Sequence, residues 1–143
     1  MNSCCYKIGE KEFYSKTITE KDVYNFAEIS GDFNPIHIDK EEAEKSVFGK
    51  LIAHGFLVAS FISNIIGMKL PGKGSIYLEQ DLKFKKPVYI GDIVTASVEI
   101  VEIINAEKRI LKLKTIVKNQ EDVIVIEGCA VVKAPDRSHN LIN

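Results

Sequence analysis

The most restrictive feature of this sequence is an apolar stretch between His54 and Met68. Its apolar side chains cover most of the circumference of a helix instead of one stripe. They are Phe56, Leu57, Val58, Ala59, Phe61, Ile62, Ile65 and Ile66. A helix of this kind must be buried on nearly all sides, so the rest of the chain has to cover it. Polar residues interrupt the stretch, which is also shorter than the roughly 20 apolar residues that cross a bilayer.

The second half of the chain follows the two-residue period of β-strands. Apolar and polar residues alternate over 76–84, 94–100 and 111–117, and a more uniformly apolar run covers 123–132. Because the links between these segments are short and polar, consecutive strands are expected to pair antiparallel as a meander. The expected architecture is α+β, with a curved antiparallel sheet wrapped around the long central helix. Apolar surface left over at the helix or at a sheet edge predicts a homodimer.

Shorter elements are expected ahead of the apolar helix. A strand is predicted over 11–18, and Thr19 with Asp22 has the spacing of a capping box that opens a helix ending at Gly31. Residues 39–44 fit a second capped helix, which is short. These elements lead the chain from the sheet to the start of the apolar helix.

The composition excludes several classes of protein. A length of 143 residues indicates a single domain, with its core over 11–132 and a polar tail over 133–143. Nineteen Lys and Arg against twenty Asp and Glu leave a net charge of −1, so no broad basic field attracts nucleic acid or an anionic membrane. The N-terminus lacks the apolar run of a secretory signal, which predicts a cytoplasmic location. Cys4, Cys5 and Cys129 lack the spacing of metal ligands, so no metal is expected.

Reactive side chains are densest in segment 30–37, which reads Ser-Gly-Asp-Phe-Asn-Pro-Ile-His. Asp32 and His37 stand five residues apart on a turn fixed by Pro35, so a carboxylate and an imidazole can be aimed into one small space. Such a pair suits addition of water to an activated double bond, or its removal. Asn34 can hold the orientation of one partner. Turn formation alone would explain every residue here except His37.

A second group of residues stands at the start of the apolar helix, in the sequence Ala53-His54-Gly55. Free amides at a helix N-terminus can stabilise an oxyanion, and glycine permits close approach of a ligand. Gly55 is the candidate donor. His54 is better explained as a capping or packing histidine than as a residue with a direct catalytic role.

The run from Gly31 to His37, followed after five residues by Ala43, resembles the hydratase 2 motif of the MaoC-like, R-specific enoyl-CoA hydratases. The segment Phe48 to Gly55 resembles the second signature of that family. The resemblance extends over about residues 11–132, nearly the entire chain. It implies a hot dog fold, in agreement with the helix and meander expected above.

The resemblance also implies the reaction and its residues. Asp32 and His37 would hold a water and exchange protons with the substrate, with Asn34 as support. The Gly55 amide would bind the thioester carbonyl oxygen, and Ser60 would line the site. The implied activity is reversible, (R)-specific hydration of trans-2-enoyl-CoA to (R)-3-hydroxyacyl-CoA, on a thioester of CoA or of acyl carrier protein. No cofactor is expected, because the thioester already polarises the alkene.

Two other functions stay open at this point. The hot dog fold also serves acyl-CoA thioesterases, although these lack the spacing of Asp32, Asn34, Pro35 and His37. The chain could instead be a non-catalytic acyl-thioester-binding subunit of a dehydratase, although such subunits usually lose the reactive pair.

Overall fold

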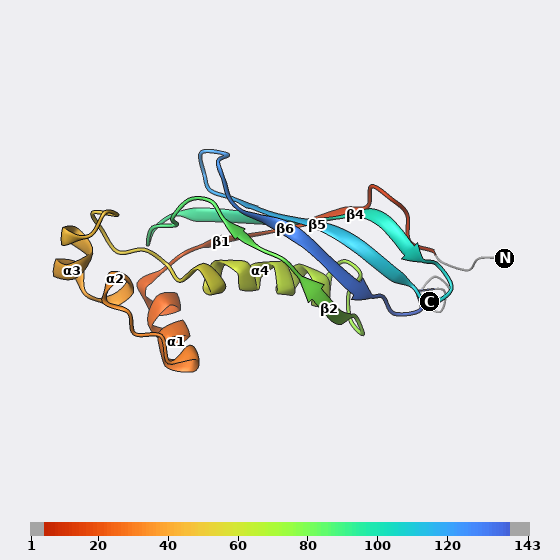
Figure 1. Ribbon diagram of the computed structural model, residues 1–143, viewed down its shortest axis with the longest axis horizontal. Helices are drawn as coiled ribbons and strands as arrows, with labels where there is room; N and C mark the ends of the chain where they lie inside the picture. The colour runs from red at the N-terminus through yellow and green to blue at the C-terminus, as the bar shows by residue number, and fades with distance from the viewer. Residues whose placement is uncertain (1–4, 138–143) are drawn as a thin grey trace.

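A computed structural model describes residues 5–137 of the chain. The elements in chain order are β1 (Lys11–Thr17), α1 (Glu20–Ser30), α2 (Pro35–Ile38), α3 (Lys40–Lys45), α4 (Gly55–Met68), β2 (Ile76–Gln80), β3 (Lys83–Phe84), β4 (Ile93–Asn105), β5 (Ile110–Lys118) and β6 (Ile124–Lys133). The long helix α4 lies along one face of an antiparallel sheet, and α1, α2 and α3 gather at one end of the molecule (Figure 1). The expected α+β class is confirmed.

The sheet has six strands in the order β1-β4-β5-β6-β2, with β3 also paired to β6. The predicted meander is confirmed for β4, β5 and β6. The prediction that the strand over 76–84 pairs with the next strand along the chain is wrong, because this segment forms β2 and β3 on the edge of β6. Strand β1 already occupies that side of β4, in register from Lys11↔Glu99 to Thr17↔Ile93. The free edge of the meander is therefore the one at β6.

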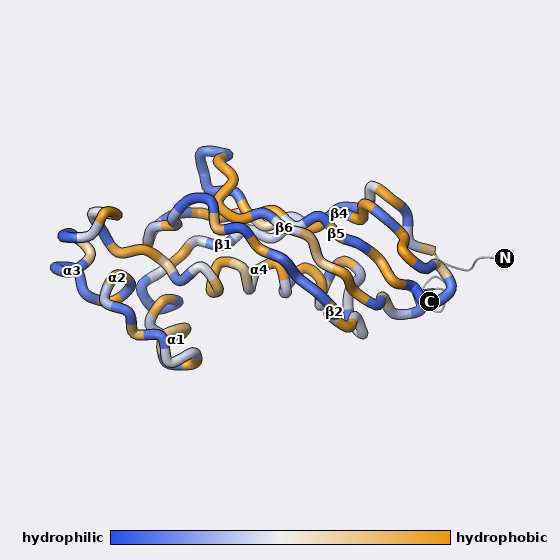
Figure 2. The backbone as a smooth tube through the Cα atoms, in the orientation of Figure 1, coloured by the Kyte–Doolittle hydropathy of each residue, from blue (hydrophilic) through white to orange (hydrophobic). Residues whose placement is uncertain are grey.

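The core lies between α4 and the concave face of the sheet. Every second residue is buried from Val94 to Ile100 of β4 and along the whole of β5. Figure 2 shows hydrophobic and hydrophilic residues in turn along these strands. The side chains that α4 buries against this face are Leu57, Val58, Phe61, Ile62, Ile65 and Ile66. Each Leu or Ile buried in this way stabilises the fold by about 1.5–3 kcal/mol relative to exposure.

One face of α4 is not covered, so the prediction of a helix buried on nearly all sides is wrong for a single chain. Phe56 and Met68 are 67% and 59% exposed, and Ser60 and Ser63 are exposed as well. The sheet covers only the opposite face, and the three short helices stand beyond the N-terminal end of α4 (Figure 1). None of the helices within residues 5–137 is long and apolar enough to cross a membrane.

The helix α1 begins and ends as expected. The hydroxyl of Thr19 accepts from the amide of Asp22, and the carboxylate of Asp22 accepts from the amide of Thr19, at 3.1 and 2.9 Å. Gly31 closes the helix with φ of 79°, a left-handed conformation that glycine adopts without strain. The second predicted helix is α3, which is capped by the side chain of Asp39.

The polar tail predicted over 133–143 is wrong for residues 133–137. Lys133 is the last residue of β6, and Ala134 is 2% exposed, with its amide bonded to the carbonyl of Arg109. Arg137 pairs with Glu10 at 2.9 Å, so this segment is fixed to the N-terminal part of the chain. Residues 138–143 lie outside the described residues, as does Cys4, whereas Cys129 is a free thiol on β6.

Candidate active site

The segment between α1 and α2 places the first two site residues. The chain leaves α1 at Gly31, and the side chain of Asn34 then accepts from the amide of Ile36 at the start of α2, with Pro35 as the first helical residue. His37 lies in the last turn of α2 and is 7% exposed. Asp32, in the loop ahead of it, is exposed.

His37 is held as one tautomer by a main-chain carbonyl. Its Nδ1 atom lies 2.7 Å from the carbonyl oxygen of Ile52. A carbonyl only accepts, so Nδ1 carries the proton and Nε2 keeps a free lone pair. Burial lowers the pKa of His37, and so does the neighbouring His54, while the Ile52 hydrogen bond and the Asp32 carboxylate act in the opposite direction. The ring is therefore neutral near pH 7, with Nε2 as a base.

His54 joins the two residues that the sequence singled out. Its Nε2 atom lies 2.9 Å from the main-chain oxygen of Asp32, and its ring stacks on that of His37 with centroids 3.9 Å apart. One acceptor or ligand atom from each of the three side chains lies within 4.8 Å of the others. The structure thus brings the carboxylate of Asp32 and the imidazole of His37 together, as expected, and adds His54.

A cluster of two histidines and an aspartate also raises the question of a metal. The histidine rings are stacked with their planes only 26° from parallel, and Nδ1 of His37 is already bonded to the carbonyl of Ile52. The Nε2 proton of His54 is also taken by the carbonyl of Asp32. The arrangement suits exchange of protons better than metal ligation, and the absence of a metal stays a prediction.

Gly55 is the first residue of α4, and the side chain of His54 makes no capping hydrogen bond to it or its neighbours. The first hydrogen bonds of the helix run from Leu57 and Val58 to the carbonyl of His54, so the amides of Gly55 and Phe56 have no partner within the helix, and the helix dipole adds positive potential there. A Cβ atom at Gly55 would lie 2.7 Å from the ring of Phe84, so any other residue here requires that ring to shift. The amide of Gly55 is therefore accessible to an anionic oxygen, and its role as the donor stays a prediction.

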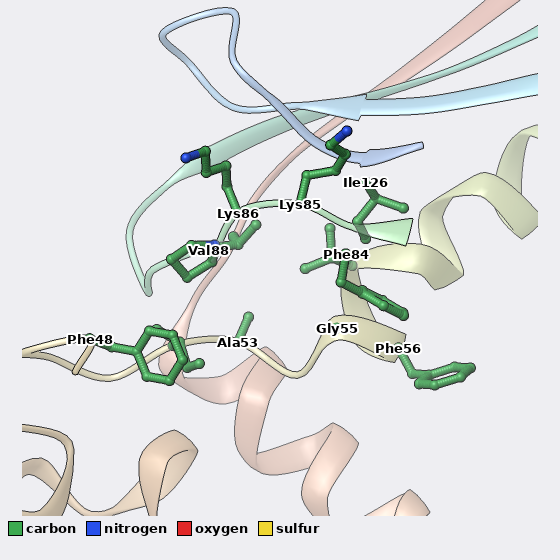
Figure 3. Close-up of a pocket in the computed structure, with 12 residues that line it drawn as sticks. Phe48, Ala53, Gly55, Phe56, Phe84, Lys85, Lys86, Val88 and Ile126 are labelled. Atoms are coloured by element: carbon green, nitrogen blue, oxygen red, sulfur yellow. The ribbon is translucent and has the colours of Figure 1, made fainter. Parts of the chain in front are cut away.

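A pocket of about 490 Å³ opens beside Gly55. Its lining is mostly apolar and consists of Phe48, Ile52, Ala53, Gly55, Phe56, Val58, Phe84, Lys85, Lys86, Pro87, Val88 and Ile126 (Figure 3). The ammonium groups of Lys85 and Lys86 point away from Gly55 in this view. Asp32 and His37 do not line the pocket. They connect to it through Ile52, which binds His37, and through His54, which precedes Gly55.

The two remaining predicted residues, Asn34 and Ser60, do not line the pocket. The side-chain oxygen of Asn34 caps α2. The main-chain N–H of Asn34 donates to the carboxylate of Asp32 at 3.1 Å, so Asn34 holds that carboxylate through its backbone. Ser60 is exposed on α4, and its hydroxyl donates to the carbonyl of Leu57 instead of lining the pocket. Sequence reasoning missed Ile52 and Phe84 and gave His54 only a packing role.

The chain is similar to proteins of known activity. A family model described as "MaoC like domain" matches residues 8–122. An "(R)-specific enoyl-CoA hydratase" of Rhodospirillum rubrum is 45% identical over 131 residues, 92% of this chain and 90% of that protein. A protein of the same description from Aeromonas caviae is 43% identical over 135 residues, 94% of this chain and 100% of that protein. A solved structure described as an (R)-hydratase from A. caviae involved in PHA biosynthesis has a TM-score of 0.89 at 44% identity, covering 92% of this chain and 98% of that one.

Proposed function

Because this chain belongs to the MaoC-like family, whose model matches residues 8–122, we propose that it catalyses reversible hydration of trans-2-enoyl-CoA to (R)-3-hydroxyacyl-CoA. Its fold is the hot dog fold of the R-hydratases that it resembles. The observation that carries the proposal is the pairing of Asp32 with His37 next to the uncapped start of α4.

The amide of Gly55 supplies the electrostatic part of the mechanism. As water attacks the β carbon, the thioester carbonyl oxygen gains negative charge and the substrate becomes enolate-like. A donor aimed at that charge is worth about 3–4 kcal/mol in the transition state. The Gly55 amide, at the positive end of the α4 dipole, is suited to this oxygen, and the apolar pocket beside it suits the acyl chain.

The pair of Asp32 and His37 supplies the proton transfers. A water between the two side chains donates one hydrogen bond to the carboxylate and one to Nε2 of His37, whose lone pair is free. The water oxygen bonds to the β carbon while its proton passes to Nε2. The same proton then passes from Nε2 to the α carbon on the same face, so that H and OH add syn and His37 ends neutral.

A second copy of the chain completes the site in this proposal. Exposed apolar side chains lie on α4 and at the sheet edge, and they include Phe56, Ile76, Leu78 and Phe84, which are between 50% and 67% exposed. Phe56 and Phe84 also line the pocket and contact each other at 5.7 Å. A homodimer that covers these residues would close the pocket and join it to the reactive pair. The sequence-predicted cytoplasmic location is compatible with an acyl-CoA substrate.

The experiment is to purify the chain alone and follow crotonyl-CoA. Hydration removes the absorbance of the conjugated enoyl thioester and forms the (R)-3-hydroxy product without releasing free CoA. Release of free thiol would support a thioesterase instead, and absence of both reactions would support a non-catalytic subunit. An (S)-3-hydroxy product would contradict the proposed stereochemistry.

A further inference from the structure

His54 is a buried titratable residue that the mechanism above does not use. It is 2% exposed and lies immediately before Gly55. Its ring stacks on that of His37, with centroids 3.9 Å apart, and also contacts the ring of Phe26, with centroids 4.9 Å apart. Its Nε2–H donates to the main-chain oxygen of Asp32 at 2.9 Å. One side chain therefore contacts both members of the reactive pair and precedes the candidate oxyanion donor.

Packing alone does not account for an imidazole at this position. Within the described part of the chain, the Nδ1 atom of His54 is buried and makes no hydrogen bond. An unpaired buried nitrogen typically costs about 1–3 kcal/mol, whereas a phenyl ring would fill similar space without that cost. Phenylalanine at position 54 could pack equally well against Phe26 and His37. What phenylalanine cannot supply is the Nε2–H that Asp32 receives.

The hydrogen bond from His54 reaches much further along the chain than the other hydrogen bonds of Asp32. The amide of Asp32 donates to the hydroxyl of Ser30, and its carboxylate accepts from the amide of Asn34, both at 3.1 Å. These bonds stay within two residues of Asp32. The bond from His54 spans 22 residues and ties the loop to the start of α4, where His37 is also fixed through Ile52.

We propose that His54 is a positioning residue, which sets the separation of the Asp32 carboxylate from the His37 imidazole chiefly through the hydrogen bond that it donates to the main-chain oxygen of Asp32 while its ring lies against His37. Its kinetic consequence rests on the proposed function, because it concerns proton transfer by this pair. A displacement of the carboxylate by about 1 Å is enough to lower turnover by about 100-fold.

Two variants separate the hydrogen bond from the stacking. His54→Phe keeps a ring between Phe26 and His37 but removes the donor. His54→Gln removes the ring but places an amide N–H near the position of Nε2. We expect His54→Phe to lower kcat for crotonyl-CoA hydration about 10- to 100-fold with KM changed less than about threefold, and His54→Gln to recover most of that loss. Phe26→Leu is the packing control, which should lower Tm while kcat stays within about twofold of wild type.

A measurement that does not depend on activity accompanies the kinetics. The heteronuclear NOE of the Asp32 and Asn34 amides should fall in His54→Phe and return in His54→Gln, while amides of α4 stay unchanged. The proposal is overturned if His54→Phe keeps kcat within about twofold of wild type, or if the two variants are equally impaired. If wild type fails to hydrate crotonyl-CoA, the proposed function fails, and unchanged amide NOE values in His54→Phe would then overturn the positioning role separately.

Discussion

The carbonyl oxygen of Ile52 determines which nitrogen of His37 can accept a proton. Its hydrogen bond at 2.7 Å occupies Nδ1, which leaves Nε2 as the base. The sequence predicted His37 because no turn chemistry explains a histidine there. It could not reveal Ile52, because a main-chain acceptor 15 residues away carries no side-chain signal.

The first residue-scale prediction concerns the reactive pair. Asp32→Asn keeps the shape of the side chain but weakens its acceptance from water, and His37→Gln removes the base. Each change should lower kcat for crotonyl-CoA hydration by about 100-fold or more, since one acid–base group contributes about 10²–10⁴. Because Asp32 is exposed, the free energy of unfolding of Asp32→Asn, measured in urea, should lie within about 0.5 kcal/mol of the wild-type value. Turnover near the wild-type value in either folded variant would remove that residue from the mechanism.

The pKa of His37 leads to a prediction about pH. Burial lowers this pKa below its ordinary value of 6.5, and only the neutral ring can accept a proton at Nε2. The acidic limb of kcat/KM for crotonyl-CoA should therefore lie below pH 6.5, with activity lost as pH falls through the lowered pKa. Stability should decline in the same direction, because the unfolded state binds the proton more readily. A limb centred above pH 6.5 would indicate that His37 is not the base.

At the scale of elements, α2 is the piece that the sequence interpretation missed. Gly31 and Pro35 were sound reasons to expect a turn, and the chain does turn there. However, Asn34 followed by Pro35 is also the signature of a helix start, since Pro is tolerated at the first helical position. The four residues of α2 carry His37 inward, so the histidine is buried instead of standing on an open loop.

The helix α4 illustrates a limit of periodicity. Its apolar residues predicted burial on nearly all sides, yet Phe56 and Met68 are more than half exposed. Hydropathy records which side chains avoid water but not which molecule covers them. The apolar pattern of α4 is the same whether a strand of the same chain or a second chain covers these side chains.

The start of α4 gives a prediction at this scale. In Gly55→Ala the new methyl group would lie 2.7 Å from the ring of Phe84, so this ring must shift and the pocket that both residues line changes shape. We expect kcat/KM for crotonyl-CoA to fall about tenfold or more, with little change in Tm because alanine suits the first turn of a helix. Adding Phe84→Ala to this variant should restore part of kcat/KM by removing the clash. An unchanged kcat/KM in Gly55→Ala alone would contradict the assignment of Gly55 to the carbonyl site.

At the scale of the whole molecule, local patterns predicted the strands but not the sheet edges. The alternation along β4 and β5, the apolar run of β6 and the short links between these strands predicted a meander. Which edge β2 joins depends on β1, whose pairing with β4 spans about 80 residues of sequence. The weak alternation of β1 gave no warning that it would occupy that edge.

The resulting free edge supports the last prediction, which concerns assembly. Strand β2 ends the sheet, and its Ile76 and Leu78 are 53% and 51% exposed. An apolar edge strand of this kind invites pairing with another chain, and a lysine is an effective block. Leu78→Lys should sediment as a monomer, whereas wild type sediments as a dimer. It should also lower kcat/KM for crotonyl-CoA, because a second chain would no longer cover Phe56 and Phe84. Val123→Lys, at a 40% exposed position after β5, is the matched control and should stay dimeric and active. Wild type that sediments as one chain while fully active would show that a single chain holds the complete site.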